Sequence, residues 1–338
     1  MQEYELSILE QYPIDVKCTR KTRGAFFCDT EQGFFLLKEA GISNSHVLIM
    51  RQLCLHLYQE GRMQTDLPVA NREGEYISTS PDGKRYILKK WFKGRECDIR
   101  KSRELLEGTA NLAHLHRFME HVPVCLPQQE EELYLPLPET CRLRSEYVRH
   151  NKELKKIRKF VRSKSPKGEF ELEFLRCYDS MFAWAQRAEE ELENASFQQL
   201  WENSVRQYTM VHGDYNYHNI LVTADGIVTT NFEKCRVDIQ MEDLYYYLRK
   251  AMEKHGWSIQ WGDHMLDAYS AIRPLSREDL EYLKIRLVYP EKFWKLADSY
   301  YRSNKAWIPV KHVEKLKTAV LQNEEKSRFL SSLFGFHL

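Results

Sequence analysis

One polar segment between two apolar, strand-like stretches constrains this sequence more than any other feature. Residues 212–219 read His-Gly-Asp-Tyr-Asn-Tyr-His-Asn, with Val211 before them and Ile-Leu-Val at 220–222 after them. Because the flanking residues are typical of short buried strands, we expect the polar residues on a loop between those strands. The loop would then present a carboxylate, Asp214, and an amide, Asn219.

A carboxylate and an amide at this spacing suit phosphoryl transfer. Such chemistry needs a carboxylate that orients the attacking hydroxyl or accepts its proton, and an amide oxygen that helps to hold a metal ion on the phosphates. Asp214 is therefore a candidate catalytic residue and Asn219 a candidate metal ligand. The alternative is a solvated loop of turn-forming residues. We expect His212 to pack and hydrogen-bond within the loop, and His218 to be structural.

A tight hairpin is predicted next, with its turn at 224–226 and its second strand at 227–230. It leads into Asn-Phe-Glu at 231–233. In kinases an acidic residue just before an aromatic holds magnesium at this point. Asn231 is neutral, so it lacks a charge attraction worth about 1 kcal/mol at ~4 Å in water and several times more when partly shielded. Glu233 would share the face of Asn231 if the strand continued, which makes both candidate metal ligands.

Residues 1–90 are expected to be rich in strands. Alternating patterns and turn signals predict strands at 15–19, 24–30, 33–38, 76–79 and 85–89, and helical spacing of apolar residues predicts a helix over 47–57. Lys38 ends a strand and is the candidate residue for binding nucleotide phosphates, the alternative being a surface lysine. Its usual glutamate partner on the next helix is expected to be missing or replaced, because residues 45–59 contain no acidic residue and Glu60 lies too far along, at the helix end. The phosphate-covering loop expected at 21–25 has a single glycine.

Residues 91–338 are expected to be mainly helical. Apolar residues at steps of three and four predict helices over 105–115 and 170–194, separated by an acidic, proline-bearing loop at 123–138. Asp243 is expected to cap a later helix. Strands followed by helices indicate two lobes that join near residues 89–94.

A basic stretch precedes the long helix. Residues 151–168 contain eight Lys or Arg residues against Glu153 alone, and helical spacing puts four lysines on one face: Lys152, Lys155, Lys156 and Lys159. This face is either solvated or docks an acidic partner or an anionic surface.

The overall composition excludes several classes. The formal net charge is +1, from 50 basic and 49 acidic residues, which gives no general attraction to nucleic acid. No apolar run is long enough for a membrane span, and the acidic start is unlike a secretory signal, so we expect synthesis in the cytoplasm. The eight cysteines show no C-x-x-C spacing and are expected to be reduced thiols, relevant to cross-linking only in an oxidised assembly.

These motifs resemble the aminoglycoside phosphotransferase and choline kinase family, whose signature is H-G-D-x-x-x-x-N followed by D-F-[DE]. The second motif has Asn231 in place of aspartate. Within that group the chain is similar to CotS-type spore coat proteins at residues 91–97, 211–222 and 289–295. The resemblance implies an α+β, bilobal, protein-kinase-like fold, with a small antiparallel-sheet lobe at 1–90 and a large helical lobe at 91–338.

The resemblance also implies a kinase-like spore coat protein, made in the mother cell and assembled with other coat proteins. Asn231 and the missing helix glutamate favour impaired or absent phosphotransferase activity, with weakened binding of ATP and Mg²⁺. Asp214, Asn219 and Lys38 keep an alternative open, an active ATP- and Mg²⁺-dependent kinase acting on an alcohol group of a small hydroxylated or amino-bearing molecule. On the interpretation of impaired activity, Asn231→Asp is expected to tighten Mg·ATP binding by about 1–3 kcal/mol if Coulomb attraction dominates in a partly shielded cleft.

Overall fold

The computed structural model describes residues 3–22, 24–122, 141–193, 197–303 and 310–337. The acidic loop expected at 123–138, Cys125 within it, and Arg23 of the expected phosphate-covering loop lie outside these ranges. Contacts divide the chain into two compact units, Met1–Leu137 with Ser204–Tyr247, and Pro138–Asn203 with Leu248–Leu338. The division into lobes at residues 90 and 91 stays a prediction.

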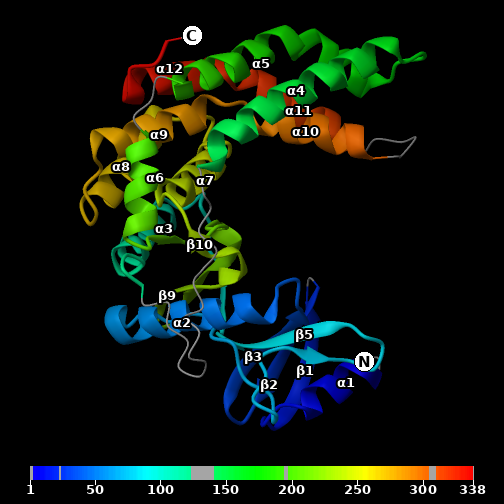
Figure 1. The fold of residues 1–338 in the computed structure, drawn as a ribbon, viewed down its shortest axis with the longest axis vertical. Helices are drawn as coiled ribbons and strands as arrows, with labels where there is room; N and C mark the ends of the chain where they lie inside the picture. Colours follow the sequence, from blue (N-terminus) through cyan, green and yellow to red (C-terminus); the bar gives the residue numbers. More distant parts are fainter. Residues whose placement is uncertain (1–2, 23, 123–140, 194–196, 304–309, 338) are drawn as a thin grey trace. The chain divides into compact units, whose positions relative to one another are not determined.

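The first unit contains a five-stranded antiparallel sheet in the order β1-β2-β3-β5-β4. This arrangement confirms the expected kinase-like α+β fold class. Its strands are β1 (Val16–Thr22), β2 (Ala25–Thr30), β3 (Gly33–Glu39), β4 (Ser78–Thr79) and β5 (Arg85–Trp91), visible in blue and cyan in Figure 1. Leu36 of β3 pairs with Lys89 of β5, and Lys38 pairs with Ile87. The two lysines are therefore diagonal neighbours on one face of the sheet.

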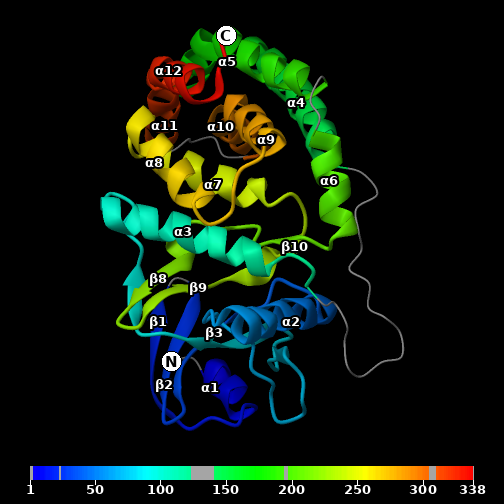
Figure 2. The ribbon, with the colours of Figure 1, turned by 90° about the vertical axis from the view of Figure 1, so that its left-hand side faces the viewer.

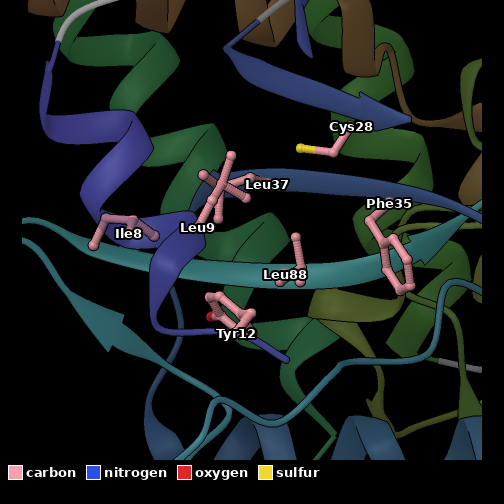
Figure 3. Close-up of a cluster of buried hydrophobic side chains, with 7 residues drawn as sticks. All are labelled: Ile8, Leu9, Tyr12, Cys28, Phe35, Leu37 and Leu88. Carbon is pink, nitrogen blue, oxygen red and sulfur yellow. The ribbon is translucent and has the colours of Figure 1, made fainter. Parts of the chain in front are cut away.

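A short helix at the start of the chain covers part of this sheet and was not expected from the sequence. The helix α1 (Glu3–Glu10) and Tyr12 contribute to a buried cluster with strand residues. Figure 3 shows the members gathered between α1 and the strands: Ile8, Leu9, Tyr12, Cys28, Phe35, Leu37 and Leu88. Full burial of each large apolar side chain contributes about 1.5–3 kcal/mol, which is enough to hold so short a helix in place.

The helix α2 (Asn44–Gly61) follows the third strand, as the apolar spacing predicts. Ser43 caps its start by accepting a hydrogen bond from the backbone N–H of His46, and Arg62 ends it in the left-handed conformation, with φ of 52°. Its buried face carries Val47, Ile49, Met50, Leu53, Cys54 and Leu57. Through this face α2 contacts α3 (Ser102–Phe118) and the short 3₁₀ helix Phe232–Lys234.

The remainder of the first unit frames the polar loop. A three-stranded sheet has the order β6-β8-β9, and β7 pairs with β10. Their bounds are β6 (Gly94–Glu96), β7 (Met210–Val211), β8 (Ile220–Thr223), β9 (Gly226–Thr229) and β10 (Arg236–Val237). Residues 212–219 therefore link β7 to β8, on a loop between strands as the sequence predicts. The helix α7 (Met241–Met252) begins a few residues after β10.

The second unit is helical. Figures 1 and 2 both show α4 (Arg142–Ser163) lying along α5 (Glu169–Glu193), and the two helices are in contact. The apolar stripe predicted for α5 is buried, from Phe174 to Leu192. The other helices are α6 (Phe197–Arg206), α8 (Ile259–Ser270), α9 (Arg277–Val288), α10 (Glu291–Arg302), α11 (Val310–Leu321) and α12 (Asn323–Phe334).

Two expectations about the whole chain can be compared with the described residues. Within those residues, no helix combines the length and the apolar character that crossing a bilayer requires. The cysteines described are unpaired, and all of them are buried except the exposed Cys18 and the partly exposed Cys141.

Candidate active site

The polar loop is held at its start by Asp243. The Asp243 carboxylate accepts hydrogen bonds from the backbone N–H groups of His212, at 2.6 Å, and Gly213, at 2.9 Å. It also lies 3.5 Å from the ring of His116. Asp243 is buried in the first turn of α7. Asp243 was expected to have a structural role as a helix cap. Its role is structural, and the backbone that its carboxylate binds is that of the polar loop.

His212 and Gly213 fix the loop conformation. The buried His212 ring donates from Nε2 to the Thr230 carbonyl oxygen, at 2.9 Å, and accepts at Nδ1 from the Asp214 backbone N–H, at 3.1 Å. This pairing assigns the Nε2–H tautomer and leaves no nitrogen for proton transfer. Gly213 has φ of +79°, and a Cβ there would lie 2.2 Å from the Lys234 carbonyl oxygen. Only glycine suits this position.

Asp214 presents a partly exposed carboxylate. One oxygen accepts from the Nδ2 of Asn216, at 3.1 Å, and the other forms an ion pair with Lys234, at 2.8 Å. The Lys234 side chain is mostly exposed, so this pair contributes little to stability and can open readily. His218 lies apart from the cluster described next, with its Nδ1 2.5 Å from the Glu96 carboxylate.

The two amides expected to hold a metal ion bind each other. Asn231 donates from Nδ2 to the Oδ1 of Asn219, at 2.7 Å, and Asn219 donates in turn to the Asp214 carbonyl oxygen, at 2.8 Å. Asn231 follows β9 in the left-handed conformation, with φ of 66° and ψ of 51°, and a 3₁₀ helix begins directly after it. The strand therefore ends at Thr229, so the condition under which Glu233 would share a face with Asn231 is not met.

Glu233 instead lies between two lysines. Its carboxylate oxygens accept from Lys38, at 2.9 Å, and from Lys89, at 2.8 Å. Lys89 also contacts the Asp66 carboxylate, at 2.5 Å, and donates to the Oδ1 of Asn231, at 3.2 Å. Asp66 accepts a further hydrogen bond from the Asn231 backbone N–H, at 2.8 Å. We call Lys38, Asp66, Lys89 and Glu233 the ion cluster, which has no net formal charge.

The buried groups of the ion cluster keep their charges at neutral pH. The side chains of Lys89 and Asp66 have no exposed surface. Burial alone would lower the pKa of Lys89, but the carboxylates of Asp66 and Glu233 outweigh that effect and raise it. Burial alone would raise the pKa of Glu233, but the charges of Lys89 and Lys38 lower it to about 2. Both groups are therefore charged at neutral pH.

Glu233 takes the place of the helix glutamate that usually binds the strand lysine in kinases. No acidic residue of α2 lies before Glu60, which is exposed at the end of that helix. Lys38 is nevertheless fixed by its pair with Glu233, in which neither side chain is more than 25% exposed. The carboxylate that pairs with Lys38 lies 195 positions further along the chain.

The residues present do not suit a Mg²⁺ site. Magnesium prefers six oxygen ligands at about 2.0–2.1 Å, with carboxylates among them. Here the oxygens of Asn219, Asn231 and Glu233 all accept hydrogen bonds from N–H or ammonium groups. Among the residues that the structure describes, no three His, Cys, Asp or Glu side chains are grouped to hold a metal ion. A divalent ion at Asn231 and Glu233 would have to compete with Lys89 for the same oxygens.

Three charged residues of the site were missed from the sequence: Asp66, Lys89 and Lys234. Lys89 carried one usable signal, since it lies two residues after Ile87 on the face of β5 that is buried. A lysine at such a position requires a buried partner. Asp66 carried none, because it lies in an irregular segment whose proximity to Asn231 depends on the tertiary fold.

The fold defines the class of this protein: it has the kinase-like fold of the aminoglycoside phosphotransferases. The aminoglycoside phosphotransferase from Alicyclobacillus acidocaldarius subsp. acidocaldarius superposes with a TM-score of 0.82 at 17% identity, covering 97% of this chain and 94% of that one. Spectinomycin phosphotransferase in complex with ADP and spectinomycin superposes with a TM-score of 0.66 at 13% identity, covering 96% of this chain and 97% of that one. Amicoumacin kinase in complex with AMP-PNP and Ca²⁺ superposes with a TM-score of 0.62 at 12% identity, covering 97% of this chain and 94% of that one. These identities show likeness of fold alone.

The amino-acid sequence identifies one family within this fold class. Residues 5–333 match the protein family described as "Spore coat putative kinase YutH", and the chain belongs to this family. Spore coat protein S of Bacillus subtilis (strain 168) is 22% identical over 334 residues, which cover 96% of this chain and 92% of that protein. The expected resemblance to spore coat proteins is confirmed, and with it the expected location in the spore coat.

Proposed function

We propose that this protein is a structural member of the spore coat in which a kinase-like site has lost efficient Mg²⁺-dependent phosphoryl transfer. One observation carries the proposal: the ammonium group of Lys89 binds the oxygens of Asn231, Asp66 and Glu233. These oxygens surround the place where kinases hold a metal ion just after the hairpin. A buried, permanently charged lysine there opposes a divalent cation.

The charge balance supports the same conclusion. The ion cluster is already neutral, so the chain would offer a Mg²⁺ ion no net negative charge beyond that of the ATP phosphates. An aspartate at position 231 would add one negative charge, which Asn231 lacks. In a partly shielded site each such unit is worth several kcal/mol. We therefore expect Mg·ATP to bind weakly.

The alternative of an active kinase rests on Asp214 and Lys38. Asp214 is partly exposed, and its pair with the exposed Lys234 can open for an incoming hydroxyl. Lys38 is aimed by Glu233, and relatives of the same fold were solved with ADP or AMP-PNP. These features support nucleotide binding through lysine, with a small hydroxylated molecule as acceptor, but they supply no carboxylate for a metal ion.

Nucleotide binding and turnover separate the two proposals. We would titrate the protein with ATP by calorimetry, with and without Mg²⁺, and measure phosphate transfer to a panel of small alcohols and amino alcohols. Asp214→Asn is the matched control, because it removes only the proposed base. We expect wild-type transfer to equal that control and to lie far below the ~1 s⁻¹ at the low end for kinases. Transfer at kinase rates that Asp214→Asn abolishes would establish the active enzyme instead.

For the structural role we propose other coat proteins as partners. Membership of a spore coat family and the 22% identity to spore coat protein S support this. A fluorescent fusion should appear on the forespore during sporulation, both in the wild type and in Asp214→Asn. Loss of coat localisation in Asp214→Asn would show that assembly depends on catalysis.

A further inference from the structure

The outer face of α4 carries a strip of cations without carboxylate partners. Among the residues that the structure describes, none of its members forms an ion pair, and all are exposed: Arg149, Lys152, Lys155, Lys156, Lys159 and Arg162. We call these six residues the cationic strip. From Arg149 to Arg162 the helix rises about 20 Å. Like charges held this close repel one another, so an anionic ligand bound along the strip would relieve that repulsion.

Two hollows open along this strip. One, of about 400 Å³, lies between α4 and α5 and is lined by Lys155, Arg158, Lys159, Arg162, Tyr178 and Phe182. The other, of about 850 Å³, includes Arg149, Lys152 and Lys156 in its lining, beside the end of α5. The two acidic residues of the larger hollow, Glu153 and Glu193, are already paired with Arg302 and Arg144. The smaller hollow has no carboxylate in its lining.

The wall of the smaller hollow contains two buried donors that lack acceptors. The hydroxyl of Tyr178 and the Nε of Arg158 have no hydrogen-bond partner among the described residues. Burial raises the pKa of Tyr178 to about 12, so its hydroxyl is a donor at neutral pH. The Arg158 guanidinium lies 4.3 Å from the centre of the Tyr178 ring. Arg158 already pairs with the Asp179 carboxylate through Nη2, at 2.7 Å. Its Nε and the Tyr178 hydroxyl remain as donors for a further carboxylate, which only accepts hydrogen bonds.

We propose that the cationic strip and its two hollows bind an acidic peptide segment of another protein. An extended peptide advances about 3.3 Å per residue, so a segment of about six residues spans the strip. Its carboxylates would pair with the exposed lysines, and side chains would enter the hollows. A flat bilayer surface would leave both hollows unfilled, and a small phosphate compound would reach only part of the strip. The proposal concerns the second unit alone and does not depend on phosphoryl transfer.

Binding of a defined peptide to the full-length protein tests this. The probe is a fluorescein-labelled peptide of about eight alternating Asp and Glu residues, with an Asn and Gln peptide as control, followed by fluorescence anisotropy near 0.05 M salt. The double substitution Lys155→Glu and Lys159→Glu reverses two strip charges. Lys311→Glu with Lys315→Glu is the matched control, since these exposed lysines have the same spacing on α11 and line neither hollow.

We expect the acidic peptide to bind and the neutral peptide not to bind. Reversal on α4 should weaken binding about tenfold or more, and reversal on α11 far less. Equal loss in both pairs would mean a general charge effect and would overturn the proposal. So would full competition by millimolar inorganic phosphate, or binding to phosphatidylserine vesicles without binding to the peptide. If the reversed protein unfolds, Lys155→Gln with Lys159→Gln provides the same comparison.

Discussion

The ammonium nitrogen of Lys89 lies 3.2 Å from the side-chain oxygen of Asn231, where a kinase of this fold would have an aspartate facing a metal ion. The lysine also contacts Asp66 and Glu233. The cation beside these oxygen atoms is therefore one that the chain itself supplies. The first two predictions below follow from this arrangement, and the other two concern Gly213 and His150.

Lys89→Met should destabilise the protein by about 3–5 kcal/mol, because it leaves the carboxylate of Asp66 buried without its partner. Urea unfolding followed by circular dichroism measures the change. Lys90→Met is the matched control: Lys90 is the exposed neighbour, and its loss should cost less than about 0.5 kcal/mol. Similar losses in the two variants would mean that the buried pair contributes nothing specific.

Asn231→Asp alone should restore little response to Mg²⁺, because Lys89 neutralises the new charge. From the sequence alone Asn231→Asp was expected to tighten Mg·ATP binding, and the contact with Lys89 leads us to propose a smaller effect. Combined with Lys89→Met, the same substitution should make thermal stability rise with Mg²⁺ concentration, by about 1–3 kcal/mol. Thermal unfolding of both variants and the wild type at increasing Mg²⁺ measures this. A full response in Asn231→Asp alone would show that Lys89 is no obstacle.

Gly213→Ala should disrupt the polar loop, at a cost above about 2 kcal/mol. The left-handed conformation penalises any side chain, and the added methyl group would meet the Lys234 carbonyl oxygen at 2.2 Å. Gly41→Ala is the control, since a Cβ there meets nothing within 4 Å and the φ of Gly41 lies outside the left-handed region that favours glycine. Chemical denaturation of the two variants compares the costs, and equal values would contradict the assigned role of Gly213.

Stability should fall with pH below about 6.5 in part through His150. Its ring is buried and stacks on Trp294 at 3.5 Å. Burial lowers its pKa to about 4; Glu291 opposes this effect, and Arg149 and Arg286 reinforce it. The unfolded chain therefore binds a proton more readily than the folded protein between pH 6.5 and 4, and acid favours unfolding there.

The expected contribution of His150 at pH 5 is about 1–2 kcal/mol. Unfolding free energies at pH 7 and pH 5 for the wild type and His150→Gln measure it, and the variant should lose less stability on acidification. His114→Gln removes an exposed histidine instead and should leave the pH dependence unchanged. The assignment fails if both variants behave as the wild type does.

Local patterns predicted the elements whose causes are local. The turns before Gly33 and at Gly83 and the alternating residues around them define β2, β3, β4 and β5 within a few positions. The helix α1 escaped notice because its eight residues contain three glutamates, and only packing on the sheet holds it. The loop motif likewise predicted that Asp214 and Asn219 share one short loop.

The charge pairing of the site could not be predicted in the same way. Lys89 and Glu233 are 144 positions apart, and their contact depends on how the sheet and the turn after β9 come together. A local sequence pattern holds no information about contacts between residues so far apart along the chain. The direction of Glu233 could not be predicted from the sequence, because one left-handed residue, Asn231, ends the strand pattern without any change in polarity around it.

That left-handed residue also bears on how such a site changes over evolutionary time. Asparagine and aspartate both tolerate this backbone conformation, and their codons differ by a single base. An exchange between them alters the charge at position 231 without requiring a different turn conformation, so one mutational step can change which cation this position favours. If Lys89 came to its present contacts only after such an exchange, a single reversion would place a carboxylate beside a lysine that already neutralises it. Two changes, at positions 231 and 89, would then be needed to return the position to metal binding.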